Sequence, residues 1–198
     1  KNIKGLEKDI DKKLWQKRKV FALLSREIND LHGKTLGIIG KGSIGMKVGR
    51  IAKAFGMNIN YFSVRNYKKT QFLKFLSSLD YLSIHCPLNE KTKDLITIKE
   101  LKIMKKNLIL INTARGGIVN ENDLTKALKQ KIIAGAGIDV TTSEPPKKSH
   151  AYYSILNEAN FIWTPHTAWA SNETLQEAIN QLIKNINSFY KGRKRNIV

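Results

Sequence analysis

Short apolar runs alternate with stretches of helical apolar spacing along most of the chain, from Thr35 onward. The short runs predict six strands, at residues 35–39, 58–62, 81–85, 108–111, 134–140 and 161–163. Helical spacing predicts helices over residues 44–55, 71–77 and 99–104, another that ends at Gln130, and a long one over 171–190. Asn120 and Asp123 are suited to cap the helix that ends at Gln130. Strands and helices that alternate in this way predict an α/β fold built on a doubly wound parallel sheet.

The first predicted strand is followed directly by glycines at the spacing Gly-x-Gly-x-x-Gly, and then by an amphipathic helix. In this context Gly40 permits a tight turn, Gly42 lets the backbone approach a pyrophosphate, and Gly45 lets the helix pack closely on the strand. The N-terminus of the helix then faces the anion. Placement between a strand and a helix favours a dinucleotide site over a glycine-rich structural turn. We therefore expect a Rossmann-type dinucleotide-binding domain.

The chain has a length suited to one large domain, and it shows no repeats, low-complexity tracts or internal linker. Residues 1–33 begin with helical spacing and continue in a stretch from Trp15 to Phe21 that we expect to be extended. This segment is interpreted as a connector or dimer arm, and the alternative is a helix packed on its own domain. Residues 34–170 are predicted to form the dinucleotide-binding domain, and residues 171–198 a C-terminal helix with a basic tail.

Composition predicts a folded protein and narrows the choice of partners. Of the 198 residues 41% are apolar, and no apolar run approaches the length of a membrane span, so we expect a soluble protein with a real core. The single cysteine, Cys86, excludes an internal disulfide and suits the cytoplasm. The net charge of +19 comes from basic residues spread through most segments, without the aromatic-interleaved stripe typical of nucleic-acid binders. We expect no nucleic-acid, membrane or metal partner, and a surface that steers anions towards the protein.

The end of the second strand distinguishes the two nicotinamide dinucleotides in such a sheet. An acidic residue there binds the ribose 2′-hydroxyl of NAD, whereas an arginine nearby accommodates the 2′-phosphate of NADP. Here the positions are Ser63, Val64 and Arg65, with no carboxylate to repel a phosphate and a guanidinium suited to binding one. We predict that NADP is favoured and that NAD can also bind. The alternative is a surface serine and arginine, with NAD bound less selectively.

Three further segments follow the fourth, fifth and sixth strands and carry side chains suited to catalysis. They contain Arg115, Glu144 and His166, at the strand ends where open α/β sheets bind ligands. Taken singly, Arg115 fits a solvated turn, Glu144 a helix cap and His166 a buried core histidine. Together they place a guanidinium, a carboxylate and an imidazole on neighbouring strand ends beside the dinucleotide site.

These motifs, in this order, resemble the nucleotide-binding part of the D-isomer-specific 2-hydroxyacid dehydrogenases, from about Trp15 to the C-terminus. Within that family the chain is most similar to glycerate dehydrogenases, also called hydroxypyruvate reductases. The similarity lies in Trp15-Gln16, in the segment Ser-Ile-His-Cys-Pro-Leu at 83–88, and in Trp169. The resemblance implies hydride transfer between a nicotinamide and a small D-2-hydroxy acid or 2-oxo acid.

The resemblance also implies roles for individual residues. Arg115 would hold the substrate carboxylate and polarise the carbonyl, His166 would exchange a proton with the substrate oxygen, and Glu144 would orient the imidazole. Positions implied to contact or line the cofactor are Ser43, Ile44, Cys86, Pro87, Thr92, Thr113, Ala114 and Asp139. Asp139 would meet the nicotinamide carboxamide. Cys86 stands where the family often has alanine, so we expect it to line the site and not to act as a nucleophile.

The substrate lobe that family members build mainly from their N-terminal residues is absent from this sequence. We therefore expect the chain to bind dinucleotide but to turn over poorly or not at all by itself, and we expect a homodimer. Phosphoglycerate and phosphonate dehydrogenases remain alternatives within the family, whereas formate dehydrogenases would carry glutamine in place of Glu144. A nucleotide-sensing corepressor on the same fold is the alternative from another class, since such relatives keep Arg115, Glu144 and His166.

Overall fold

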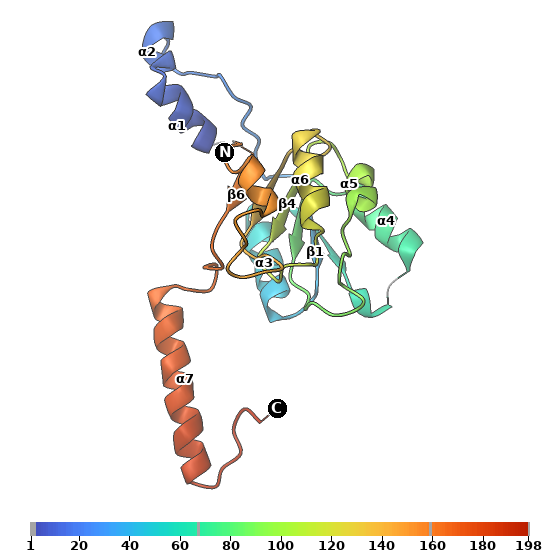
Figure 1. The fold of residues 1–198 in the computed structure, drawn as a ribbon, viewed down its shortest axis with the longest axis vertical. Helices are drawn as coiled ribbons and strands as arrows, with labels where there is room; N and C mark the ends of the chain where they lie inside the picture. Colours follow the sequence, from blue (N-terminus) through green and yellow to red (C-terminus); the bar gives the residue numbers. More distant parts are fainter. Residues whose placement is uncertain (1–2, 67, 159, 198) are drawn as a thin grey trace. The chain divides into compact units, whose positions relative to one another are not determined.

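A computed structural model describes residues 3–66, 68–158 and 160–197, and the chain divides into two compact units (Figure 1). Lys1–Trp163 is the first unit and Thr164–Val198 is the second. Within the described ranges, no helix is both long and apolar enough to cross a membrane.

Six parallel strands form one sheet in the first unit. They are β1 (Thr35–Ile39), β2 (Asn58–Phe62), β3 (Tyr81–Ile84), β4 (Ile109–Asn112), β5 (Gly135–Ile138) and β6 (Phe161–Trp163). Their order across the sheet is β2-β1-β3-β4-β5-β6. The chain moves outward from β1 to β2 and then crosses to the other side of β1, which creates a topological switch point between β1 and β3. The predicted α/β fold with a doubly wound parallel sheet is confirmed.

Helices connect consecutive strands: α3 (Ser43–Ala54), α4 (Lys69–Ser77), α5 (Ile98–Ile103) and α6 (Glu121–Lys129) follow β1, β2, β3 and β4 in turn. The predicted cap of α6 is confirmed, because the Asn120 side chain accepts a hydrogen bond from the Asp123 amide. Two short 3₁₀ helices, η1 (Val64–Asn66) and η2 (Ala151–Ile155), were not predicted. Neither is long enough for a helical period to show in the sequence.

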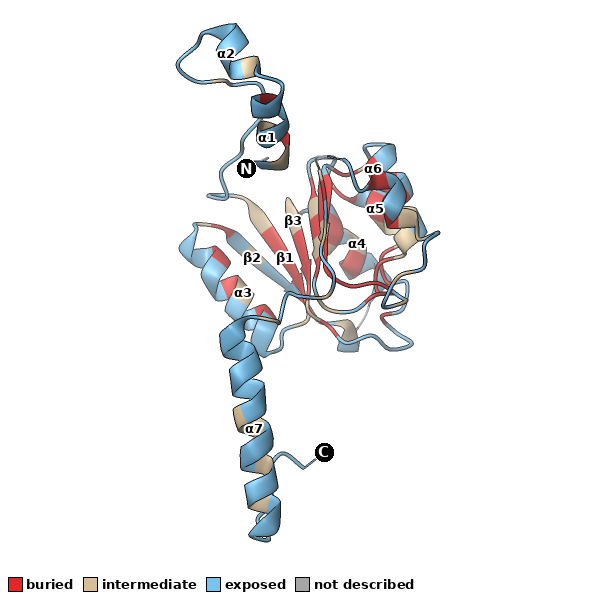
Figure 2. Ribbon diagram, turned by 60° about the vertical axis from the view of Figure 1, so that its left-hand side comes forward, coloured by how far each residue is buried: buried red, intermediate tan, exposed pale blue. Residues whose placement is uncertain are grey.

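The two faces of the sheet have separate apolar cores. Figure 2 colours buried residues red, and they lie along the strands and on the helices beside the sheet. Alternate residues of β1 point to opposite faces, so Ile38 belongs to the smaller core and Ile39 to the larger one. The smaller core also contains Ala52 of α3. The larger core lies among α4, α5, α6, η2 and the sheet, and its buried side chains include Phe72, Leu101, Leu124 and Tyr152. Helices on both faces hold the strand ends in place for the loops that follow them.

Among residues 3–33, which the structure describes, lie two helices, α1 (Ile3–Asp11) and α2 (Leu14–Arg18). The helical spacing at the start of the chain is confirmed by α1. The extended conformation expected from Trp15 to Phe21 is wrong for the part that forms α2. This five-residue helix lies between Lys13 and Lys19, which have left-handed φ values of 55° and 48°. It consists mainly of good helix formers, and a helix this short leaves no readable period.

α1 attaches to the rest of the first unit through lysine side chains. The Lys4 ammonium donates to the carbonyl oxygens of Leu156, Glu158 and Phe161, and the Lys8 ammonium donates to that of Asn157. These carbonyls lie between η2 and β6 and in β6 itself. The helix therefore contacts its own unit by polar groups, while Ile3 and Ile10 remain exposed.

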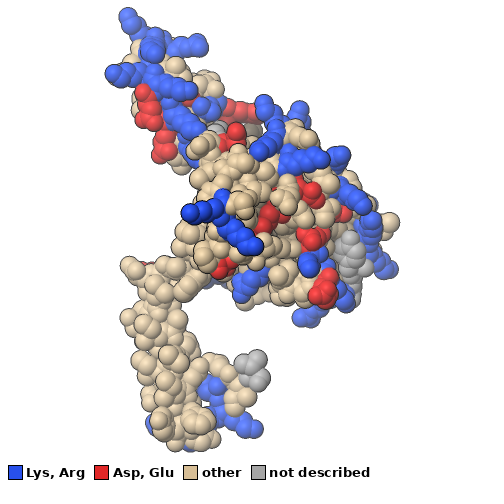
Figure 3. All heavy atoms as spheres, in the orientation of Figure 1, with Lys and Arg blue, Asp and Glu red and all other residues tan. Residues whose placement is uncertain are grey.

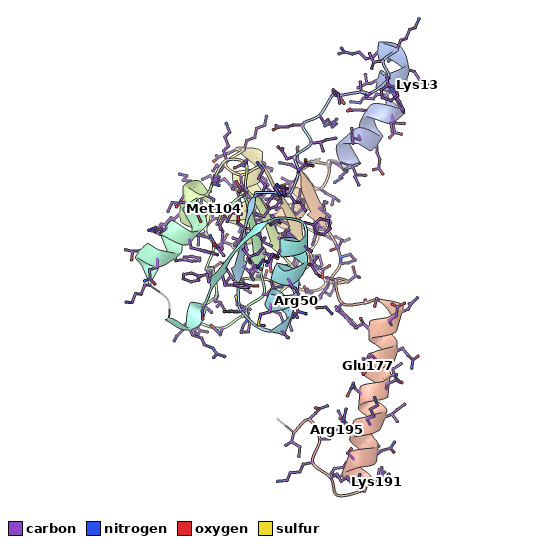
Figure 4. All side chains as sticks on the ribbon, turned by 180° about the vertical axis from the view of Figure 1, so that it is seen from behind. Lys13, Arg50, Met104, Glu177, Lys191 and Arg195 are labelled. Carbon is purple, nitrogen blue, oxygen red and sulfur yellow. The ribbon has the colours of Figure 1, made fainter. Side chains whose placement is uncertain are left out.

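The second unit contains α7 (Asn172–Tyr190), which confirms the long helix predicted over 171–190. The Ser171 hydroxyl caps it by accepting a hydrogen bond from the Thr174 amide. The basic tail turns back along the helix, where the Arg195 guanidinium donates to Gln181 and Asn185 (Figure 4). Within this unit, the helix and its tail are therefore joined by side-chain hydrogen bonds.

Candidate functional site

The carboxyl ends of the six strands lie in one row of the sheet. The register pairs across that row join Phe62, Ile39, Ile84, Asn112, Ile138 and Trp163 in spatial order. The segments that follow these ends within the first unit carry every site residue predicted there, at 40–45, 63–65, 86–92, 113–115 and 139–144. One edge of the sheet therefore gathers them.

The glycine loop lies at the switch point between β1 and β3. Gly40 has a φ of 102°, and a Cβ on it would lie 2.5 Å from the His85 carbonyl oxygen just after β3. A Cβ on Gly45 would collide with the Gly40 carbonyl, so α3 packs directly on this turn. Gly42, the N-terminal cap of α3, differs from both, because no described atom other than those of its chain neighbours lies within 4 Å of its Cβ position. The open space at Gly42 and the first-turn amides of Ser43 and Ile44 fit a pyrophosphate.

A cavity of about 440 Å³ lies where the segments after β2 and β3 approach each other, and Val64, Arg65, Asn89, Glu90 and Lys91 line it. The Ser63 hydroxyl accepts a hydrogen bond from the Arg65 amide at 3.4 Å. Two basic residues, Arg65 and Lys91, and one acidic residue, Glu90, are therefore among those that line the cavity. Lys91 was missed by sequence reasoning, because only the sheet order brings the segment after β3 close to the segment after β2.

Arg115 and Glu144 line a second cavity, of about 460 Å³, together with Lys93, Thr141 and Thr142. The loops after β4 and β5 approach closely here because Gly116 has no side chain: a Cβ on Gly116 would collide with the Thr141 backbone. Asn89 and Glu90 line both this cavity and the one beside Arg65. The two cavities are therefore neighbours along the same edge of the sheet.

Buried Asn112, at the end of β4, shapes the loop that presents Arg115. Its side-chain amide donates to the Arg115 carbonyl at 3.0 Å, and its side-chain oxygen accepts from the Ala114 amide at 3.0 Å. Thr113, which lies between Asn112 and Ala114 in the chain, is exposed. Asp139 is buried, and its amide donates to the Asn112 carbonyl at 3.0 Å. Sequence reasoning missed Asn112, since a single amide at the end of an apolar strand has no distinctive pattern.

The segment after β3 carries Cys86, Pro87 and Thr92. Burial raises the pKa of the Cys86 thiol to about 11, so the thiol stays protonated near neutral pH and is a weak nucleophile. Thr92 is fully buried, and its hydroxyl donates to the Pro87 carbonyl at 2.7 Å and accepts from the Asn89 amide at 2.8 Å. Thr92 therefore closes the loop that presents Asn89 to both cavities.

His166 lies in the second unit, three residues after the end of β6. It has a φ of 53°, which is uncommon for a residue other than glycine. Its amide donates to the Thr164 carbonyl at 3.1 Å, and the Trp169 indole donates to the His166 carbonyl at 3.0 Å. Because His166 belongs to the second unit, its association with Arg115 and Glu144 stays a prediction.

A parallel sheet with a glycine loop at its switch point and ligand-sized cavities along the same edge defines a dinucleotide-binding domain. Residues 1–168 match the family model described as D-isomer specific 2-hydroxyacid dehydrogenase, NAD binding domain. The chain belongs to this family, and the resemblance seen in the sequence is confirmed.

Individual relatives agree with the family. The chain is 43% identical to a glycerate dehydrogenase from Methylorubrum extorquens over 188 residues, which are 93% of this chain and 59% of that protein. It is 40% identical to a glyoxylate reductase from Thermococcus litoralis over 173 residues, 82% of this chain and 50% of that protein. The crystal structure of the NAD complexed form of a D-isomer specific 2-hydroxyacid dehydrogenase from Lactobacillus delbrueckii ssp. bulgaricus matches with a TM-score of 0.83 and 28% identity, over 100% of this chain and 64% of that one. The chain thus spans less than two thirds of each of these proteins.

Proposed function

We propose that the protein carrying this chain is an NAD(P)-dependent oxidoreductase that interconverts a small D-2-hydroxy acid and its 2-oxo acid, of the hydroxypyruvate or glyoxylate type. The observation that supports this most directly is the pairing of Arg115 and Glu144 in one cavity beside the dinucleotide edge. A guanidinium suits a carboxylate substrate, and the neighbouring cavity at Arg65 suits the far end of a dinucleotide. The relatives named as glycerate dehydrogenase and glyoxylate reductase support this substrate class and favour an enzyme over a corepressor.

In this proposal Arg115, His166 and Glu144 have distinct chemical roles. The nicotinamide cofactor, when bound, supplies or accepts the hydride. Arg115 offers its planar fork of donors to the substrate carboxylate and polarises the carbonyl. His166 donates a proton to the carbonyl oxygen during reduction and accepts it during oxidation, and Glu144 favours the protonated imidazole. The left-handed φ of His166 supports a functional role, because such backbone conformations concentrate at active sites.

The test is a panel of 2-oxo acids assayed with the full-length protein and each nicotinamide cofactor. Reduction of hydroxypyruvate or glyoxylate, at rates well above those for phosphorylated or phosphonate substrates, is the expected result. Dinucleotide binding without reduction of any 2-oxo acid would contradict the proposal and would favour the corepressor.

We further propose that NADP is the favoured cofactor and that NAD also binds. Arg65 and Lys91 give the first cavity two cations for a 2′-phosphate, against the one carboxylate of Glu90. Replacing both cations by alanine should lower kcat/KM for NADPH by about tenfold or more and change that for NADH little. Lys93→Ala, which alters a cation in the other cavity, is the matched control and should leave the cofactor ratio unchanged. A wild-type preference for NADH would refute this proposal.

We also propose a homodimer in which the stretch after α2 contacts a second copy of the chain. Phe21 is 98% exposed and Leu24 is 88% exposed, an uncommon degree of exposure for large apolar side chains so close together. Serine at both positions should shift the protein towards monomer in analytical ultracentrifugation. Phe55→Ser, at an exposed apolar position after α3, is the control. A dimer of undiminished affinity in the double variant would exclude this surface.

A further inference from the structure

A glutamate outside the predicted site holds the loop that contains Glu144. Glu121, the first residue of α6, accepts hydrogen bonds from both the amide and the hydroxyl of Thr142, at 2.6 and 2.8 Å. Thr142 lines the cavity shared by Arg115 and Glu144. Glu121 therefore ties α6 to the wall of the proposed substrate site through charge-assisted hydrogen bonds.

His150 supports Glu121 from the other side. Its Nε2 lies 2.8 Å from the Glu121 carboxylate, and the two side chains are only 9% and 12% exposed. The His150 Nδ1 accepts from the Tyr152 amide at 3.3 Å, which assigns the proton to Nε2 and makes it the donor to Glu121. The imidazole also stacks on Trp163, with ring centroids 5.5 Å apart. The pair is thus fixed by η2 and β6 as well as by α6.

The hydrogen-bond network continues from Thr142 to Glu144 through Thr141, the residue that precedes Thr142. The Thr141 amide donates to the Glu144 carboxylate at 2.9 Å, and the Thr141 hydroxyl donates to the Ser143 carbonyl at 2.9 Å. Thr141 is buried, and Gly116 packs against its backbone. Holding Thr142 in place therefore also fixes the direction in which the Thr141 amide meets the Glu144 carboxylate.

We propose that Glu121, braced by His150, is a positioning residue for Glu144. The proposal rests on the proposed oxidoreductase function for its catalytic consequence, but its structural part stands without it. Glu121 acts through Thr142 and Thr141, so its loss should free the Glu144 carboxylate to move within a cavity whose other charged groups are Arg115, Lys93 and Glu90. Catalysis would suffer because the imidazole partner would no longer be held in one geometry.

Amide hydrogen exchange of the full-length protein tests the structural part. Glu121→Ala should speed exchange of the Thr142 amide by about tenfold or more, because that amide loses a charged acceptor. It should also speed exchange of the Thr141 amide, towards the rate measured in Glu144→Ala, where that amide has lost its partner. A folded Glu121→Ala protein with unchanged Thr141 exchange would overturn the proposal.

The chain offers a matched control in Glu100, which accepts from both the amide and the hydroxyl of Thr97 in the same manner. Thr97 and Glu100 cap α5, and they line neither the cavity at Arg65 nor the cavity at Arg115. Glu100→Ala should expose the Thr97 amide and leave the Thr141 amide protected. If Glu121→Ala does not fold, Thr142→Val replaces it, since it removes only the hydroxyl bond. Unchanged Thr141 exchange in Thr142→Val would then overturn the proposal.

Kinetics test the catalytic part. Glu121→Ala should lower kcat/KM for reduction by between about tenfold and a hundredfold and move the alkaline limb of its pH profile to lower pH. The combined Glu121→Ala and Glu144→Gln variant should show little further shift, because both changes remove the same support. Glu100→Ala should leave the profile in place. An unreactive wild type would refute the proposed function, and the exchange result would still decide whether Glu121 positions Glu144.

Discussion

His166 is the residue whose replacement tests the proposed chemistry most directly. His166→Ala removes the proposed proton donor for the substrate oxygen, so kcat for reduction should fall by about 10² to 10⁴-fold. Cofactor affinity, measured by fluorescence titration, should change little because the glycine loop is untouched. His32→Ala removes a histidine that packs beside Gly56, just before the amino end of β2 and so opposite the carboxyl ends of the strands, and serves as the control. Turnover that survives in His166→Ala would remove it as the acid.

Replacing Glu144 should change the pH profile of reduction more than its maximal rate. In the proposed mechanism the Glu144 carboxylate lies beside the His166 imidazole and favours its protonated form. Glu144→Gln loses that charge, so the alkaline limb of the reduction profile should move to lower pH. The measurement is kcat/KM for reduction across the pH range, and a limb that does not move would refute the assigned role.

Asp80 has a structural task at the opposite end of the strands. Burial raises the pKa of its carboxyl, but hydrogen bonds from the Thr35 amide, Lys105 and Asn107 outweigh burial and set the pKa below its usual value. A lowered pKa means that the carboxylate stabilises the fold above pH of about 4, and that this stability is lost as the pH falls through the folded-state pKa.

We therefore expect Asp80→Ala to lower the free energy of unfolding by about 1–3 kcal/mol near pH 7. The difference from wild type should shrink as the pH falls below 4, because protonation removes the same interactions. Urea unfolding at several pH values measures both effects. Asp30→Ala, at an exposed position, should stay within about 0.5 kcal/mol of wild type. A constant difference at all pH values would show that the charge is not involved.

At the scale of elements, two glycines of one loop should respond differently to the same change. Gly45→Ala pushes α3 away from the turn at Gly40, so both stability and cofactor binding should fall. Gly42→Ala meets open space and has an ordinary φ of −84°, so stability should hold. Its methyl group would occupy the space that the pyrophosphate needs, so cofactor affinity should fall by about tenfold or more. Thermal unfolding measures the effect of each variant on stability, and cofactor titration measures its effect on affinity. Equal destabilisation by Gly42→Ala and Gly45→Ala would contradict the prediction.

The strands and the glycine loop could be predicted because each is encoded locally. Thr35–Ile39 is a short apolar run that ends in the glycine pattern, and the observed bounds of β1 match those predicted. The contacts between loops could not be predicted in this way. Lys91 reaches the same cavity as Arg65, and Glu121 reaches Thr142, only because the sheet order and the α6 position bring distant segments together. Residues without a catalytic pattern, such as Asn112, also give no local signal.

At the scale of the whole chain, charge is the dominant feature. Lys and Arg side chains are spread over the face of the first unit seen in Figure 3, with Asp and Glu among them. This distribution agrees with the expectation that the net charge of +19 is a property of the surface at large. A field of this sign attracts small anions and dinucleotides from a distance.

Long-range electrostatic attraction should make the rate of substrate encounter depend on salt concentration, which contacts inside the bound complex do not. The Debye length shortens from about 30 Å at 0.01 M salt to about 8 Å at 0.15 M, so steering should be strong at low salt and largely screened at physiological salt. We expect kcat/KM for an anionic 2-oxo acid to fall several-fold over this range while kcat stays nearly constant, because steering acts on encounter and not on the bound complex. An uncharged viscosity agent, compared at each salt concentration, identifies the regime in which encounter limits the rate. A kcat/KM that does not depend on salt would mean that the basic surface is only solvated and that Arg115 and its neighbours capture the substrate by contact alone.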